Sequence, residues 1–414
     1  MQHLYIHVPF CVRRCSYCDF SIAVRKRIPA QEYVDTILNE LTRVGSPAAV
    51  PRGKPNHHSG PVGSGTGDGP VGSGTEVDGS FSPGRGPGAR HPGEVDTVYF
   101  GGGTPSLLPP DGIGRLLREL LPRTTHDARR TIEVTLEANP EGVTPDKAKA
   151  WRAAGVNRVS LGAQSFDDAV LKWMHRSHDA ARIGAAVHAL RGAGIENISL
   201  DLIFALPDEL QRDWERDLDM ALALRPNHLS LYGLTVEPRT PLDRWISRGA
   251  TQALDDERYA EEYLLAHRRL TADGFLFYEV SNAARDGFRS QHNSAYWSGK
   301  PYRGLGPAAH SFDGTTRRWN LRAWEAYRRA IAEGRSAVES EERLTAEQRE
   351  LERVYLALRT GEGLAITAPY RPLPPLMSQG WVVEHNGRLR CTPEGWLRLD
   401  SLVNELAMHT ETQQ

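Results

Sequence analysis

The stretch His7-Val-Pro-Phe-Cys-Val-Arg-Arg-Cys-Ser-Tyr-Cys-Asp-Phe20 carries three of the chain's four cysteines, in the spacing Cys-x3-Cys-x2-Cys. Three thiolates this close together can bind a metal centre, form a disulfide or carry out redox chemistry. A disulfide would leave one thiol unpaired, and structural zinc would need His3 or His7 as a fourth ligand. Iron–sulfur clusters usually have four cysteine ligands, so three would leave one iron free to bind another molecule.

The composition narrows the class of protein. The 414 residues are 39% apolar and 25% charged, with a formal net charge of −2, which is typical of a soluble globular protein. No charge excess predicts binding to nucleic acid or to an anionic membrane, and no apolar run approaches the ~18 residues of a membrane helix. The first residues lack the basic and apolar regions of a secretory signal, so we expect the protein to be located in the reducing cytoplasm.

Apolar strands alternate with amphipathic helices over the first 240 residues. Strands are predicted at 4–8, 96–100, 131–137, 158–162, 198–203 and 229–232, with helices at 31–44, around 116–121, at 144–154, 167–174 and 179–192, and after Pro207. This alternation predicts βα units and a parallel sheet, here an α/β fold with a partial (β/α)6 barrel. Residues 46–93 are rich in Gly, Pro and Ser with a tandem repeat, and we predict a disordered insertion in a surface loop.

Ligand-type residues recur where these strands end. They are Cys11, Gly103, Glu137, Gln164 and Asp201. Because parallel sheets bind ligands beyond the carboxyl ends of their strands, these residues predict one shared site. The glycines at 101–103 either expose N–H groups to a ligand or form a plain tight turn.

Two further regions complete the predicted domain organisation. Residues 1–240 form the core, and 241–340 extend it with a strand at 274–280 and a polar-aromatic segment at 290–297 placed in glycine-rich loops. His292 and His310 there could line a pocket or be structural histidines. Residues 341–414 read as a helix, a hairpin with an Asn-Gly turn and a final helix from Thr392, a winged-helix-like domain. Its four arginines against five acids over 366–414 predict a packing or lid role rather than DNA binding.

Taken together, an ordered series of motifs resembles the oxygen-independent coproporphyrinogen III oxidase-like branch of the radical S-adenosylmethionine proteins. The motifs are His7-Val-Pro-Phe-Cys11, Gly101-Gly-Gly-Thr-Pro-Ser106, Glu137-Ala-Asn-Pro140, Asn157-Arg-Val-Ser-Leu-Gly-Ala-Gln-Ser165, Asp201-Leu-Ile203, Tyr278-Glu-Val-Ser-Asn282 and His292-Asn-Ser-Ala-Tyr-Trp297. Oxidases of this branch resemble one another in a fourth cysteine, where this chain has Phe20, and in an extension before the first strand, which here begins at Leu4. The chain is similar instead to the heme-chaperone group of the branch, for which residues 292–297 look characteristic.

The resemblance implies cofactors, cargo and partners. It implies a [4Fe-4S] cluster on Cys11, Cys15 and Cys18, an exchangeable S-adenosylmethionine, and heme that is passed to acceptor hemoproteins such as respiratory ones, with a homodimer as one form of control. His292 is the first candidate for a heme ligand. The S-adenosylmethionine site implied by the resemblance comprises Tyr5, Tyr17, Gly102, Gly103, Thr104, Glu137, Gln164, Arg176, Asp201, Gly233 and His310.

The chemistry of these residues suits that cofactor, since a carboxylate needs a cation such as Arg176 and ribose hydroxyls suit carboxylate acceptors. The alternative function is an oxygen-independent coproporphyrinogen III oxidase that decarboxylates a porphyrin precursor by radical chemistry. Another radical enzyme on the same scaffold, for instance a methyltransferase, is a weaker third reading. Whether the protein is an enzyme at all is left open by the sequence.

Overall fold

The computed structural model describes residues 3–43, 95–121, 131–253, 255–367, 370 and 374–411. The predicted disordered insertion at 46–93 lies outside these residues. In the described part of the chain, no helix is both long and apolar enough to span a membrane.

A nine-stranded sheet forms the centre of the molecule, in the order β11-β1-β4-β5-β6-β7-β8-β10-β9. The six strands from β1 to β8 are parallel neighbours, and β11 adds a further parallel strand beside β1. This arrangement confirms the predicted partial (β/α)6 barrel, called the half-barrel below. Its six strands are β1 (His3–Val8), β4 (Thr97–Gly102), β5 (Glu133–Ala138), β6 (Arg158–Gln164), β7 (Asn197–Phe204) and β8 (His228–Gly233).

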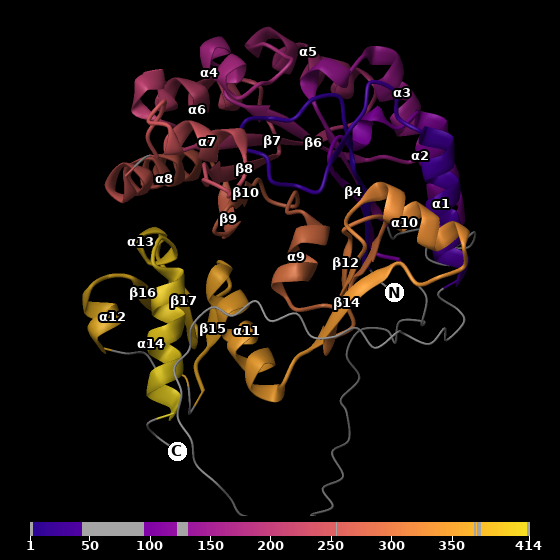
Figure 1. Ribbon diagram of the computed structural model, residues 1–414. Helices are drawn as coiled ribbons and strands as arrows, with labels where there is room; N and C mark the ends of the chain where they lie inside the picture. Colours follow the sequence, from indigo (N-terminus) through magenta and orange to yellow (C-terminus); the bar gives the residue numbers. More distant parts are fainter. Residues whose placement is uncertain are drawn as a thin grey trace, which may run out of the picture.

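Helices cover the outer face of this sheet, as Figure 1 shows for the arc from α1 to α6. Between consecutive parallel strands, one or two of these helices return the chain to the start of the next strand, which is why sequential strands are neighbours. The helices are α1 (Ala30–Arg43), α2 (Pro110–Leu120), α3 (Pro145–Ala154), α4 (Asp168–Trp173), α5 (Ala180–Gly192), α6 (Trp214–Ala223), α7 (Pro241–Ser247) and α8 (Asp256–Ala272). The predicted helix after Pro207 begins only at Trp214, because Asp208–Leu210 forms a separate 3-10 turn.

The two faces of the strands differ in chemistry because strand side chains alternate. Apolar residues such as Leu136, Leu161 and Leu200 are fully buried in the core under the helices. On the inner face, polar side chains hydrogen-bond across strands, for example Ser199 Oγ with His228 Nδ1 at 2.8 Å. The half-barrel therefore encloses a polar interior that can hold charged ligands.

Elements after residue 275 extend both edges of the central sheet and add a second sheet, β12-β13-β14. They are β9 (Leu276–Glu279), β10 (Asn282–Ala284), α9 (Gln291–Trp297), β11 (Arg303–Leu305), β12 (His310–Phe312), β13 (Thr316–Asn320), α10 (Trp324–Ala332) and β14 (Val338–Arg343). The predicted loop at 290–297 is wrong, because residues 291–297 form helix α9. Ser290 caps this helix by accepting from the backbone N–H of Asn293, and the Glu133 carboxylate accepts from the N–H groups of Gln291 and His292.

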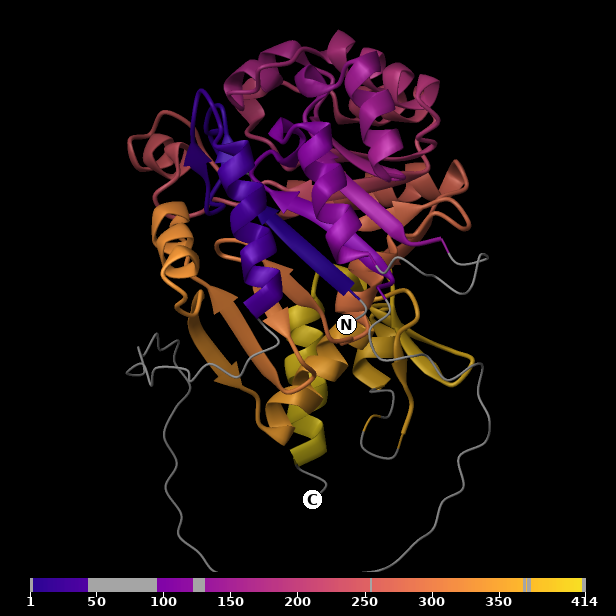
Figure 2. The same ribbon diagram turned by 90° about the vertical axis from the view of Figure 1, so that its right-hand side faces the viewer.

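The C-terminal elements form a small α/β unit beside α9, drawn in yellow and orange in Figures 1 and 2. They are α11 (Ala346–Arg359), β15 (Leu364–Ala365), α12 (Pro374–Ser378), β16 (Val382–His385), β17 (Arg388–Cys391), α13 (Pro393–Trp396) and α14 (Leu399–Glu411). The hairpin turns at Asn386-Gly387 as predicted, with both φ angles positive. The predicted single final helix is instead two, α13 and α14. The unit is joined to the sheet by the ion pair of Arg359 with Glu279, at 2.8 Å.

Candidate functional site

The cysteine loop is fixed where β1 ends. β2 (Phe10–Cys11) pairs with β3 (Ala23–Val24), which closes the loop at its base. In the middle of the loop, Ser16 donates its N–H to Met174 O at 3.2 Å and accepts from Leu242 N at 2.9 Å. All four cysteines of the chain are free thiols. The loop is thus held by backbone bonds on several sides while its thiols stay unpaired.

A cavity of about 380 Å³ lies between this loop and the carboxyl ends of the strands. It is lined by all three cysteines of the loop and by residues from β4 to β8. Of the residues that the sequence pointed to, the cavity brings together Cys11, Cys15, Tyr17, Cys18, Gly102, Gly103, Thr104, Glu137, Gln164, Arg176, Asp201 and Gly233. Elements far apart in the sequence therefore converge on one space.

The glycine turn packs directly against the cysteine loop. Gly103 N donates to Val8 O and Thr104 N donates to Phe10 O, both at 2.8 Å. The expectation that the glycines expose N–H groups to a ligand is therefore wrong for these positions, since Gly102 N also donates, to Glu137 Oε2 at 3.1 Å. Instead, the turn brings its backbone close to the backbone of the cysteine loop.

A side chain at Gly103 should disturb the cysteine loop. A Cβ atom there would lie 2.7 Å from Phe10 O and 3.0 Å from Cys11 Sγ. We expect Gly103→Ala to lower the free energy of unfolding by about 1–3 kcal/mol, as overpacking does, and to reduce the iron retained after cluster reconstitution. Urea denaturation and iron assay measure the two effects. Gly192→Ala is the control, because a Cβ there meets nothing within 4 Å; equal behaviour of both variants would contradict the prediction.

Two carboxylates face the cavity from β5 and β7. Tyr99 OH donates to Glu137 Oε1 at 2.9 Å, and burial raises the pKa of Glu137 to about 7 despite this hydrogen bond. Asp201 accepts from Ser160 Oγ at 2.9 Å, and burial also raises its pKa. A ligand that carries hydrogen-bond donors would stabilise both carboxylates.

Arg176 is the cation of the site. Its Nη2 donates to Asn139 Oδ1 at 2.7 Å and to Gly162 O at 2.9 Å, while Nη1 lies 3.5 Å from Cys15 Sγ. Among the described residues, no carboxylate lies within ion-pair distance of this guanidinium, and its Nε is buried without a hydrogen-bond partner. A positive charge beside a thiol and an open cavity is suited to an anionic ligand.

Three of the residues implied by the resemblance do not line this cavity. Tyr5 lies behind Tyr99, with ring centroids 6.0 Å apart, and lines a separate cavity together with His310. His292 is 1% exposed, and its two ring nitrogens lie 2.7 Å from Thr97 Oγ1 and 2.8 Å from Tyr296 OH. In this conformation both ring nitrogens of His292 are occupied by protein contacts, and neither faces a ligand cavity.

Other residues that line the cavity were not predicted from the sequence. Tyr99, Asn139, Ser160 and Ser230 all contribute to the cavity. The side chains of Tyr99 and Ser160 lie on the inner face of their strands, as those of Glu137 and Asp201 do. The alternation of side chains along a strand could therefore have predicted both residues.

The zinc alternative is not supported by the geometry. In the described ranges, no group of three or more His, Cys, Asp or Glu side chains is arranged to hold a single metal ion. His7, one proposed fourth ligand, lies 3.2 Å from both Tyr5 OH and Ser21 O through its two ring nitrogens. Three free thiols around an open cavity with an unpaired cation fit an iron–sulfur cluster that keeps one exchangeable position.

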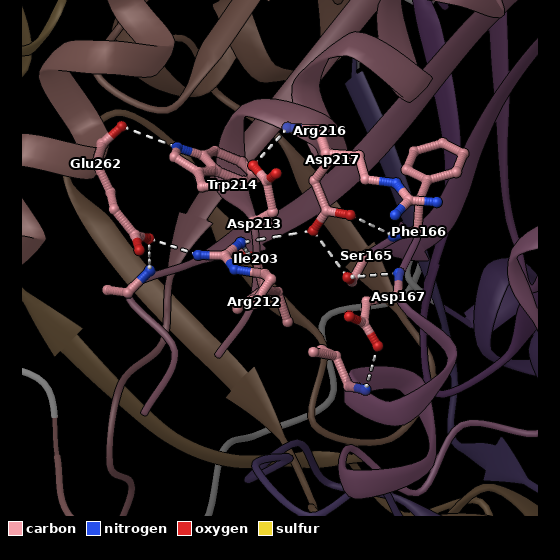
Figure 3. A network of polar contacts seen from close by, with 12 residues as sticks. Ser165, Phe166, Asp167, Ile203, Arg212, Asp213, Trp214, Arg216, Asp217 and Glu262 are labelled. Carbon is pink, nitrogen blue, oxygen red and sulfur yellow. Dashed lines mark hydrogen bonds and ion pairs between the residues drawn. The ribbon is translucent and has the colours of Figure 1, made fainter. Parts of the chain in front are cut away.

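A buried ion network supports two loops at the mouth of the half-barrel (Figure 3). Arg212 pairs with Glu262 of α8 at 2.5 Å and with Asp217 of α6 at 3.6 Å. Glu262 accepts from Ala205 N after β7, and Asp217 accepts from Phe166 N after β6, each at 2.7 Å. The network therefore fixes the backbone just beyond the ends of two strands that line the cavity.

A half-barrel with a three-cysteine loop over its strand ends defines the class: this is a radical S-adenosylmethionine protein, and the Radical SAM superfamily model matches residues 88–221, with the HemN C-terminal domain model matching 344–398. The heme chaperone HemW of Mycobacterium tuberculosis (strain CDC 1551 / Oshkosh) is 34% identical over 97% of this chain and 94% of its own length. The chain belongs to the heme chaperone HemW family.

Other relatives agree with this assignment. HemW of Bacillus subtilis is 30% identical over 88% of this chain and 85% of its own, and HemW of Escherichia coli is 35% identical over 74% and 69%. Among solved structures, coproporphyrinogen III oxidase (HemN) of Escherichia coli matches with a TM-score of 0.72 at 21% identity, covering 100% of this chain and 90% of that one. That likeness supports the fold.

Proposed function

We propose that this protein is a heme chaperone that binds heme as cargo and transfers it to acceptor hemoproteins, with cluster and S-adenosylmethionine as resident cofactors. The observation that carries the proposal is the convergence of three free thiols, an unpaired arginine and two buried carboxylates on one cavity. The similar heme chaperones of Mycobacterium tuberculosis and Bacillus subtilis point to heme as the cargo. Cytoplasmic location, respiratory acceptors and a homodimer belong to the same proposal.

Within the cavity the chain's residues have distinct tasks. Cys11, Cys15 and Cys18 would hold a [4Fe-4S] cluster, which would supply one-electron chemistry beside the S-adenosylmethionine site. Arg176 neutralises the carboxylate of S-adenosylmethionine, and the carbonyl groups of the glycine turn accept from its amino group. Glu137 and Asp201 accept hydrogen bonds from the ribose hydroxyls.

Phe20 separates this proposal from the oxidase alternative. Its side chain is 60% exposed and borders the cavity at the position where the oxidases resemble one another in a cysteine. A phenyl ring cannot ligate iron, and its exposure leaves an apolar surface at the entrance. The position therefore favours a carrier over a catalyst.

A single purified sample can test the two functions against each other. We expect the anaerobically reconstituted protein to bind heme in a 1:1 ratio, followed by absorbance in the Soret region, and to form no protoporphyrinogen from coproporphyrinogen III with S-adenosylmethionine and a reductant. Transfer is then measured by adding an apo-hemoprotein and following its heme spectrum. Porphyrinogen turnover without heme binding would overturn the chaperone proposal and favour the oxidase.

A further inference from the structure

We propose that heme binds in the second cavity, which Tyr5 and His310 line, and that His310 is its axial ligand. This inference rests on the proposed function and replaces His292 as the candidate ligand. The cavity measures about 390 Å³, within the usual range of ligand pockets, ~300–1,000 Å³. The stacked rings of Tyr5 and Tyr99 separate it from the first cavity, which the cysteine loop lines and which is called the cofactor cavity below.

Aromatic side chains form the walls of this second cavity. They are Tyr5, Tyr296, Trp297, Tyr302 and Phe312. The rings of Tyr296 and Tyr302 meet edge to face, with centroids 4.5 Å apart and planes at 82°, so they form a continuous apolar corner. Aromatic walls favour a flat, largely apolar ligand that can stack or meet ring edges, as a tetrapyrrole does.

His310 offers the metal ligand on this wall. It begins β12, is exposed, and stacks on Trp319 with centroids 5.9 Å apart. Within the described chain, no hydrogen bond engages its ring, and partial burial together with Arg317 and Arg322 lowers its pKa. The neutral imidazole therefore has a lone pair available for iron.

Two other histidines beside the second cavity are already engaged. The ring nitrogens of His7, which also lines the second cavity, lie 3.2 Å from Tyr5 OH and Ser21 O. His292 is held by Thr97 and Tyr296 and is buried. Of the three imidazoles, His310 alone needs no rearrangement to reach a ligand.

Cations at the rim suit the two carboxylates of heme. Lys300 is exposed and, in the part of the chain that the structure describes, forms no ion pair; Arg317 is paired with Glu352. Beyond the shared wall of Trp297, Phe312 and Glu352 lies a third cavity of about 490 Å³, which adds further arginines from the C-terminal unit. A macrocycle wider than the second cavity can extend toward that side.

The proposal also gives a role to the segment at 292–297. Tyr296 and Trp297 line the second cavity, whereas Asn293 lines the cofactor cavity. His292 holds Tyr296 through the contact between its Nε2 and the phenol oxygen, 2.8 Å apart. His292 is then a positioning residue for the cargo wall rather than a ligand.

Heme titration of matched variants tests the assignment. We expect His310→Ala to weaken heme binding at least about tenfold and to change the Soret and electron paramagnetic resonance spectra, with added imidazole restoring the wild-type spectrum. His292→Ala should bind more weakly but keep the wild-type ligand spectrum. His385→Ala, a change on the exposed hairpin, is the control and should bind like the wild type.

The results separate the inference from the proposed function. An unchanged affinity and spectrum for His310→Ala, with heme bound by the wild type, would overturn the inference and leave the chaperone proposal standing. Loss of the ligand spectrum in His292→Ala alone would also overturn it. A wild-type protein that binds no heme would overturn the proposed function itself. Circular dichroism checks that each variant is folded.

Discussion

Replacing Cys11, Cys15 or Cys18 by alanine is expected to reduce the iron retained after reconstitution by at least about tenfold. Each thiol belongs to the loop over the cofactor cavity, and each supplies one of only three protein bonds to the proposed cluster. Removing one thiol would leave the cluster held by only two protein bonds. Iron and sulfide assays, with visible absorbance of the reconstituted protein, give the measurement.

The fourth cysteine provides the matched control. Cys391 lies at the end of β17 in the C-terminal unit, is buried, and is a free thiol like the others. Cys391→Ala removes a thiol of the same type without touching the loop, so its iron content should equal that of the wild type. Full iron in any variant of the loop, or loss of iron in Cys391→Ala, would contradict the assignment of three ligands.

Arg212→Ala is expected to lower the free energy of unfolding by about 3–5 kcal/mol, because it leaves Asp217 buried without its cation and leaves Glu262 only the longer contact with Arg258 at 3.6 Å. The side chains of this network are at most 8% exposed, so water cannot replace the lost partner. Urea denaturation at pH 7 measures the change. The same variant should bind S-adenosylmethionine more weakly, since the loops after β6 and β7 lose their anchor.

A second pair between the same two helices serves as the control. Arg269 of α8 pairs with Asp219 of α6 at 2.6 Å, but both side chains are about half exposed. Exposed pairs contribute little, so Arg269→Ala should leave the denaturation midpoint unchanged within error. If both variants behaved alike, the burial of the Arg212 network would not matter for stability.

Local periodicity predicted most of the fold because the half-barrel separates two environments cleanly. Leu136 and Leu161 pack under helices while Glu137 and Ser160 face inward, so strands, helices and their order could be predicted from the chain. The same regularity explains the cofactor cavity. Glu137, Gln164 and Asp201 end parallel strands, and parallel strands end on one edge.

What could not be predicted depends on contacts between distant segments. Helix α9 has seven residues and no clear apolar periodicity. Glu133 of β5, which is distant in the sequence, stabilises the first turn of this helix. Tyr5 was expected beside the cofactor. In the structure Tyr99 on the neighbouring strand lines the cofactor cavity, and Tyr5 lines the second cavity. His292 and His310 are equally polar in the sequence, and only the tertiary structure buries one and exposes the other.

Helix α9 stands between two binding spaces, with Asn293 on one side and Tyr296 on the other. A ligand that shifts this short helix changes the free energy of binding on both sides, and such coupling is reciprocal by thermodynamic necessity. If S-adenosylmethionine changes the affinity for cargo by a given factor, cargo changes the affinity for S-adenosylmethionine by the same factor.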